Sequence, residues 1–267
     1  MPGPSGPLSG VPGLRVGWRR VAPVVAGVTA VVLTVGGCGR GDGDGGARLR
    51  VLAAASLAPA VAETADVFAR QHPAVDVEVS GAGSGELVTQ VLEGAPADVL
   101  VTADEPTMAW VADRDRLRGQ PRRLARNRLV VVVEAGNPKG VRGLADLARP
   151  DVLVALGAPD VPVGRYAEKA LRRAGVEVRP ATREASVTGV LGKVALGEVD
   201  AGIVYATDVA RAGGQVEAIA LPDAHDVEVV DLVAVLDGAD REAATFVAFL
   251  LGADGQAVFR RHGFLPA

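Results

Sequence analysis

The chain has 267 residues, of which 49% are hydrophobic and 3% aromatic, with 34 Gly and 17 Pro. This composition supports a packed core of Ala, Val and Leu, which excludes a disordered or collagen-like chain. The formal charge is −4, and a mildly acidic chain of this kind does not suggest a general nucleic-acid binder. The single cysteine and the 3 scattered histidines exclude a disulfide framework and leave little for a metal site.

The first 37 residues are typical of a secretory signal peptide. Three arginines and no acidic residue precede the apolar run 21–35, which is shorter than the roughly 20 residues that span a bilayer. The sequence Val35-Gly36-Gly37-Cys38 follows, and it resembles a bacterial lipobox, in which the signal is cleaved before a cysteine that is lipidated. A signal peptide with an incidental cysteine is the alternative. We predict a signal peptide over 1–37 and a lipidated Cys38.

The next segment has the composition of a flexible linker. Five of the eight residues in Gly39–Gly46 are glycine, and such a stretch has nothing to bury in a core. We therefore predict that residues 38–48 tether a folded body to a membrane through the lipid on Cys38.

From Leu49 onward, short apolar runs alternate with amphipathic segments, a pattern typical of βα units and a mainly parallel sheet. The predicted strands are 49–54, 75–79, 99–102, 129–133, 152–156, 202–205 and 229–236. The predicted helices are 58–71, 85–93, 105–113, 143–148, 164–174, 188–197, 206–213 and 240–261. The predicted fold class is α/β.

Two of the apolar runs, 129–133 and 227–236, are continuous and follow charged, non-helical segments. We interpret both as strands that cross between two α/β lobes. Lobe 1 then comprises residues 49–130 and 229–267, and lobe 2 comprises residues 131–228. This arrangement leaves a cleft between the lobes, where the N-termini of helices can converge.

The segment 114–128 contains seven arginines. One interpretation is a docking surface for an acidic partner or for lipid headgroups, as in a cell-surface adhesion or assembly protein. Because 25 of the 28 basic residues of this chain are arginine, a solvated arginine-rich surface is the favoured interpretation.

Four segments end an extended stretch and begin a helix with small, hydroxyl-bearing or glycine residues. They are Ala53–Pro59, Ser80–Leu87, Pro162–Tyr166 and Ala185–Gly189. The first turn of a helix leaves N–H groups unpaired and carries partial positive charge, so it can hold an anion without a cationic side chain. Each segment alone is more typical of an ordinary helix cap. A dinucleotide-binding loop is disfavoured, because Glu86 stands where the fingerprint that begins at Gly81 requires its last glycine.

Signals for catalysis are weak. Neither Ser56 nor Ser84 lies in a Gly-x-Ser-x-Gly motif. The acids nearest the four helix starts are Asp104 and Glu184, and Asp104 is better explained as the N-cap of the helix that follows it. An enzyme that uses the cleft between the lobes is therefore the disfavoured alternative, and we expect no enzymatic activity.

Six segments, taken in chain order, resemble the molybdate-binding proteins of ABC transporters across residues 49–267. They are Ala53–Leu57, Gly94–Asp104, Asn127–Val133, Pro162–Ala167, Gly202–Tyr205 and Phe259–Phe264. The resemblance implies a two-lobed, periplasmic-binding-protein-like fold of type II, with strands that cross between the lobes. It also implies that neutral donors alone hold a tetrahedral oxyanion.

The resemblance implies a role for five residues. Ser56 and Ser84 would each supply a hydroxyl and a backbone N–H, Val163 and Val187 would supply backbone N–H groups, and Tyr205 would supply its phenol. The family often has alanine at the position of Val163, and a backbone donor tolerates valine unless the extra methyl groups crowd the cleft. Molybdenum would be present only within bound molybdate, and no cofactor is implied.

The resemblance therefore implies a lipid-anchored, extracytoplasmic receptor, at the cell surface or in the periplasm, that captures molybdate and tungstate. Its partners would be an ABC permease with its ATPase, and we expect a monomer. A receptor for sulfate or another tetrahedral oxyanion is the near alternative. Phosphate should be rejected, because a cavity with donors only has no acceptor for the proton of hydrogen phosphate.

Overall fold

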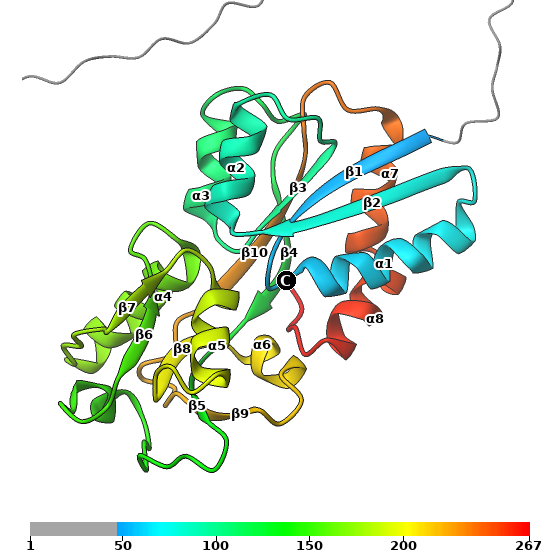
Figure 1. Cartoon of the computed structure of the whole chain (residues 1–267). Coiled ribbons are helices and arrows are strands. Elements are labelled where there is room, and N and C mark those ends of the chain that lie inside the picture. The colour runs from blue at the N-terminus through cyan, green and yellow to red at the C-terminus, as the bar shows by residue number, and fades with distance from the viewer. Residues whose placement is uncertain (1–46) are drawn as a thin grey trace, which may run out of the picture. The chain divides into compact units, whose positions relative to one another are not determined.

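The computed structural model describes residues 47–267 (Figure 1). The predicted signal peptide, 1–37, and the predicted lipidation site, Cys38, lie outside the described residues. Ala47 and Arg48, the last residues of the predicted tether, are instead the first residues of strand β1 (Ala47–Ala54). Within residues 47–267, no helix combines the length and the apolar character needed to cross a membrane.

The first sheet has five strands in the order β2-β1-β3-β10-β4. β1 runs parallel to β2 and β3, whereas β10 runs antiparallel to β3 and β4. The bounds of the partner strands are β2 (Val75–Ala82), β3 (Val99–Thr102), β4 (Arg122–Asn127) and β10 (Val229–Val235). The associated helices are α1 (Ala58–Gln71), α2 (Ser84–Leu92), α3 (Glu105–Ala112), α7 (Arg241–Leu251) and α8 (Ala253–Arg261).

Helices cover both faces of this sheet. Successive strand residues point to opposite faces, so neighbouring residues of one strand pack against different helices. Val51 of β1 belongs to the core that contains Phe68 of α1 and Phe246 of α7. Its neighbour Leu52 belongs to a separate core with Met108 of α3 and residues of α2. Figure 1 shows the two helix groups on opposite sides of the strands.

The second sheet also has five strands, in the order β7-β6-β8-β5-β9. β6 runs parallel to β7 and β8, whereas β5 runs antiparallel to β8 and β9. The bounds are β5 (Leu129–Glu134), β6 (Val154–Gly157), β7 (Thr182–Glu184), β8 (Ala201–Tyr205) and β9 (Val216–Ala220). Its helices are η1 (Leu144–Ala148), α4 (Pro162–Ala174), α5 (Val187–Ala195) and α6 (Ala206–Arg211). Both sheets are thus mixed, and in each a single strand, β10 or β5, runs antiparallel to its neighbours.

The chain passes between the sheets twice. It leaves the first sheet at Asn127 and enters the second at Leu129, and it returns through residues 221–228 to β10. The predicted α/β class is confirmed. We refer below to the elements of the first sheet with their helices as lobe 1, and to those of the second sheet as lobe 2.

Two details of the predicted elements are wrong. The helix expected over 240–261 is two helices, α7 and α8, because the backbone at Gly252 is extended and interrupts the helix. A Cβ built on Gly255 would lie 2.4 Å from the carbonyl oxygen of Phe249, so this close approach requires glycine. The segment 143–148 forms the short 3₁₀ helix η1 in place of an α-helix.

Three strands were not predicted, and all three lie at sheet edges. β4 ends the first sheet, while β7 and β9 are the two edges of the second. Edge strands are often short and charged, and β4 presents the exposed Arg122 and Arg123. Such strands lack the continuous apolar run by which the central strands were identified.

The arginine-rich segment makes several contacts within the chain. Arg114 donates to the carbonyl oxygen of Trp110 at 2.9 Å, and Arg118 donates to that of Ala239 at 3.1 Å. Arg126 donates to the carbonyl oxygen of Pro266 at 2.7 Å. These contacts give at least part of the arginine content a structural role at the edge of lobe 1.

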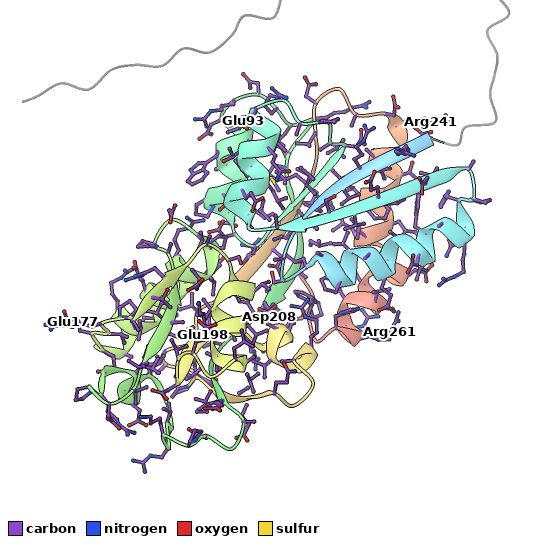
Figure 2. The ribbon with its side chains drawn as sticks, viewed as in Figure 1. Glu93, Glu177, Glu198, Asp208, Arg241 and Arg261 are labelled. Atoms are coloured by element: carbon purple, nitrogen blue, oxygen red, sulfur yellow. The ribbon has the colours of Figure 1, made fainter. Side chains whose placement is uncertain are left out.

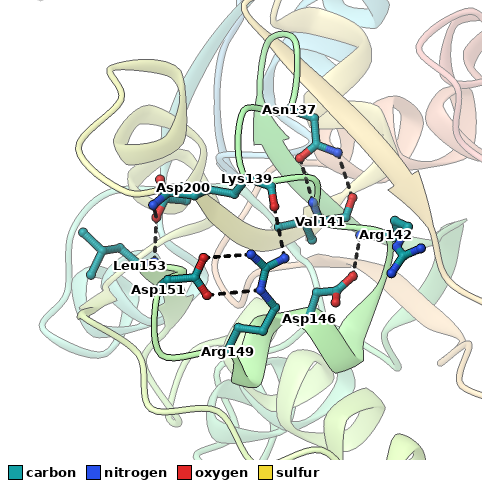
Figure 3. Close-up of polar contacts among 9 residues, drawn as sticks. All are labelled: Asn137, Lys139, Val141, Arg142, Asp146, Arg149, Asp151, Leu153 and Asp200. Atoms are coloured by element: carbon teal, nitrogen blue, oxygen red, sulfur yellow. Dashed lines mark hydrogen bonds and ion pairs between the residues drawn. The ribbon is translucent and has the colours of Figure 1, made fainter.

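Polar contacts organise the connection from β5 to β6 (Figure 3). The side chain of Asn137 donates to the carbonyl oxygen of Val141 at 2.7 Å and accepts from its N–H at 2.9 Å. Asp200 accepts from the N–H of Leu153 at 2.7 Å, just before β6. The connection is thereby fixed to lobe 2, and β6 leads directly to the start of α4.

Candidate functional site

A small cavity lies where helices from both lobes begin. Its accessible volume is about 20 Å³, which suits one small ion or molecule. It lies at the carboxyl ends of β1, β3 and β8, the usual position of ligand sites in α/β sheets. The lining residues are Ala54, Ala55, Ser56, Gly83, Ser84, Ala103, Val161, Pro162, Val163, Ala185, Ser186, Val187 and Tyr205.

Lobe 1 contributes two serines to the cavity. Ser56 lies in the turn between β1 and α1 and is 3% exposed, and Ser84 is the first residue of α2 and is 4% exposed. The Oγ of Ser84 accepts a hydrogen bond from the N–H of Ala103 at 3.3 Å. Because that oxygen acts as an acceptor, its own O–H remains available to donate. Ser84 also offers a backbone N–H in the first turn of α2.

Lobe 2 contributes backbone groups from two helix starts. Pro162, the first residue of α4, has no N–H, so the first amide donor of that helix is Val163. Val187 is the first residue of α5, and its N-cap Ser186 accepts from the N–H of Gly189 at 3.3 Å. The N–H of Val187 therefore does not take part in that cap.

Close backbone packing sets the position of Val163. A Cβ built on Gly164 would lie 1.9 Å from the carbonyl oxygen of Ala158. A Cβ on Gly157, the last residue of β6, would lie 2.7 Å from the backbone nitrogen of Gly164. Only glycine allows α4 to start this close to the end of β6, so the sequence Pro-Val-Gly holds the amide of Val163 at the cavity.

Tyr205 ends β8 and is 1% exposed. Within the described residues, its hydroxyl oxygen is buried and has no hydrogen-bond partner. Burial, with smaller effects from Tyr166 and nearby carboxylates, raises the pKa of this phenol well above its usual 10.0. The group is therefore a neutral donor at physiological pH. A buried hydroxyl without a partner costs about 1–3 kcal/mol, which a ligand that accepts its hydrogen bond would offset.

Two buried carboxyl groups lie near enough to Tyr205 to affect its pKa, and sequence reasoning missed both. Asp208 lies in α6 and is labelled in Figure 2. Desolvation raises its pKa to about 6, against the opposing effect of Arg211, with which it forms an ion pair. Desolvation and the neighbouring Asp208 and Asp104 raise the pKa of Asp231, in β10, well above its usual value. Neither residue lies in a recognisable motif, so no local pattern could have identified them.

The donor set of the cavity fits an anion held without cations. No charged side chain is among the residues that line it. Across residues 47–267, no group of three or more His, Cys, Asp or Glu side chains is placed to hold a metal ion. The five residues predicted as ligands, Ser56, Ser84, Val163, Val187 and Tyr205, all line this one cavity.

The two acids considered for catalysis have structural partners. Asp104 accepts from the N–H of Thr107 at 3.0 Å as the N-cap of α3, which confirms the expected cap. Glu184 accepts from the hydroxyl of Thr182 at 2.7 Å. Neither is among the residues that line the cavity.

Comparison with known proteins supports this description. The family model for a bacterial extracellular solute-binding protein matches residues 49–265. The molybdate-binding protein ModA of Mycobacterium tuberculosis is 40% identical over 187 residues, which cover 70% of this chain and 72% of that protein. ModA of Haemophilus influenzae is 34% identical over 193 residues, 67% of this chain and 74% of that protein.

A solved structure shows the same fold. The periplasmic molybdate-binding protein of Azotobacter vinelandii aligns with a TM-score of 0.69 at 21% identity, over 81% of this chain and 98% of that one. The predicted two-lobed, periplasmic-binding-protein-like fold is therefore confirmed. The relatives are named for binding molybdate, and the matching family model is that of a solute-binding protein. This chain belongs to the bacterial extracellular solute-binding proteins and, among them, to the family of the molybdate-binding protein ModA.

Proposed function

We propose that this protein captures molybdate, and with it tungstate, outside the cytoplasm and presents it to an ABC permease with its ATPase. The observation that carries the proposal is the buried, unpartnered hydroxyl of Tyr205 in a cavity whose other walls are helix starts and serines. The name and the 40% identity of the mycobacterial relative support molybdate as the oxyanion.

The donors account for both affinity and selectivity. Hydrogen bonds to a charged acceptor are roughly twice as strong as neutral ones, so hydroxyls and helix N–H groups can hold a dianion without a salt bridge. A ligand that touches Ser84 in lobe 1 and Val163 in lobe 2 stabilises the closed arrangement of the lobes. Hydrogen phosphate would bring a proton that needs a strong acceptor, and no carboxylate lines this cavity, which disfavours that ion.

We further propose that the receptor is a monomer, needs no cofactor and is held at the membrane by a lipid on Cys38. The lipobox-like sequence Val35-Gly36-Gly37-Cys38 supports the anchor. Replacement of this cysteine by Ala should release the protein from membranes into the soluble fraction of cells. Continued membrane attachment of the Cys38→Ala variant would contradict the proposed anchor.

The function is tested by calorimetric titration of residues 39–267 with molybdate, tungstate, sulfate and phosphate in parallel. We expect tight one-to-one binding of molybdate and tungstate, weak binding of sulfate and no heat with phosphate. Preference for sulfate would identify a receptor for that oxyanion instead. The absence of binding to all four would overturn the proposal and reopen the enzyme and adhesion alternatives.

A further inference from the structure

An ion pair between a buried carboxylate and a partly exposed arginine joins the two lobes next to the cavity. Asp104 follows β3 in lobe 1, and its side chain is 2% exposed. Its Oδ1 accepts from the N–H of Thr107, while its Oδ2 accepts from the Nε of Arg165 at 2.7 Å. The Nη2 of Arg165 lies 2.6 Å from the same oxygen. Arg165 belongs to α4 of lobe 2, so this pair spans the lobes.

The guanidinium of Arg165 makes further contacts with lobe 1. Its Nη2 also donates to the hydroxyl of Thr107 at 2.5 Å, and its central carbon lies 6.0 Å from the ring centre of Trp110. Both partners belong to α3 of lobe 1. Arg165 additionally contacts the carbonyl oxygen of Asp160 in its own lobe. One side chain of lobe 2 thus engages a carboxylate, a hydroxyl and an aromatic ring of lobe 1.

The pair differs from an ordinary surface salt bridge, because Asp104 is buried when the lobes meet. The attraction within a desolvated, hydrogen-bonded pair is stronger than within an exposed one, and rehydration of both charges offsets part of it when the lobes separate. When the lobes separate, the helix cap from Thr107 stays with Asp104, whereas the contact with Arg165 is lost. The pair therefore favours the closed arrangement specifically.

Arg165 also lies two residues after Val163, the first amide donor of α4. The same helical turn therefore carries a proposed oxyanion donor and the guanidinium that engages lobe 1. Neither Asp104 nor Arg165 lines the cavity, so the pair does not contribute charge directly to the ligand shell.

We propose that Asp104 and Arg165 form a latch that holds the lobes closed over the bound oxyanion. This inference rests on the proposed function. Arg165 is a positioning residue, since it acts on the ligand only through the placement of α4 against lobe 1. The latch slows the release of the ligand without touching it.

The test is the affinity and dissociation rate of molybdate for the wild type and for Asp104→Asn, Arg165→Gln and the double variant. Asparagine is a good N-cap, so Asp104→Asn retains the cap of α3 while it removes the charge. We expect each single variant to raise Kd about tenfold, almost entirely through faster dissociation, because changes at an interface act mostly on the dissociation rate. The double variant should be no weaker than the weaker single variant, because both remove one interaction. Arg165→Lys should restore part of the slow dissociation.

The matched control is Arg172→Gln on the same helix. Arg172 is 70% exposed and lies 3.7 Å from Glu168 within lobe 2, so its loss should leave dissociation unchanged. Thermal unfolding without ligand separates a structural defect from a latch, because latch variants should match the wild type there. Dissociation rates of Asp104→Asn and Arg165→Gln equal to the wild type would overturn the latch. Failure of the wild type to bind any oxyanion would instead overturn the proposed function.

Discussion

The two walls of the cavity are built in different ways. Lobe 1 presents serine hydroxyls, Ser56 and Ser84, whose chemistry depends on the side chain. Lobe 2 presents the amides of Val163 and Val187, which any residue other than proline could supply, together with the phenol of Tyr205. The wall of lobe 1 is therefore sensitive to residue identity, whereas much of the wall of lobe 2 is sensitive to backbone position.

The largest expected effect comes from a change that moves the backbone of lobe 2. In Gly164→Ala, the new Cβ would lie 1.9 Å from the carbonyl oxygen of Ala158, so α4 must shift. We expect oxyanion binding to be lost and the free energy of unfolding to fall by about 1–3 kcal/mol, as for other overpacked sites. Calorimetric titration measures oxyanion binding, and urea unfolding measures the free energy of unfolding.

Gly192→Ala in α5 is the control, because nothing lies within 4 Å of its new Cβ. This change should leave binding intact and stabilise the protein by about 0.5–1 kcal/mol, the usual gain for alanine within a helix. Normal binding by Gly164→Ala would show that the start of α4 does not depend on glycine.

The pH dependence of stability probes Asp208, the buried acid of α6 in lobe 2. Because the pKa of Asp208 is raised from 3.8 to about 6 in the folded chain, the folded state holds its proton more tightly. The contribution of Asp208 protonation to the free energy of unfolding is fully present below about pH 4. It is lost as the pH rises through 6, and the loss is at most about 3 kcal/mol. Asp208→Asn should remove this part of the pH dependence in urea unfolding. Identical profiles for both proteins would contradict the raised pKa.

Changes to the hydroxyl donors of the two walls should weaken binding through different routes. Tyr205→Phe removes a hydroxyl without a partner, so molybdate affinity should fall by about 1–3 kcal/mol while ligand-free stability stays equal or rises. Ser84→Ala should lower affinity by a similar amount and also reduce stability, because Ala103 loses its acceptor. Unchanged affinity in both variants, measured by calorimetry, would refute these assignments.

The smallest effect is expected for Val163→Ala. The backbone N–H, the proposed donor, remains in this variant, so molybdate affinity should change by less than the roughly 1 kcal/mol of one lost hydrogen bond. A tenfold loss in titration would show that the valine side chain, rather than its amide, shapes the wall of lobe 2.

The α/β class and most central elements could be predicted from the sequence, because a continuous apolar run such as 129–133 indicates a strand that is buried on both faces. The five predicted ligand positions followed from the resemblance, and all five residues line one cavity of the structure. The edge strands β4, β7 and β9 escaped prediction, since pairing with remote strands defines them rather than local hydrophobicity. The pair Asp104–Arg165 joins residues 61 apart in the chain, so no local spacing reveals it.

A cavity lined without charged side chains also bears on how a ligand departs. Each proposed hydrogen bond from Ser84, Val163 or Tyr205 to the ligand could be exchanged for one to water once the lobes part. No cation among the lining residues would then be left without its counter-ion. In the proposed receptor, affinity then exists only while the lobes are together. A permease that pulls the lobes apart would therefore free the oxyanion without having to offer it a competing charge.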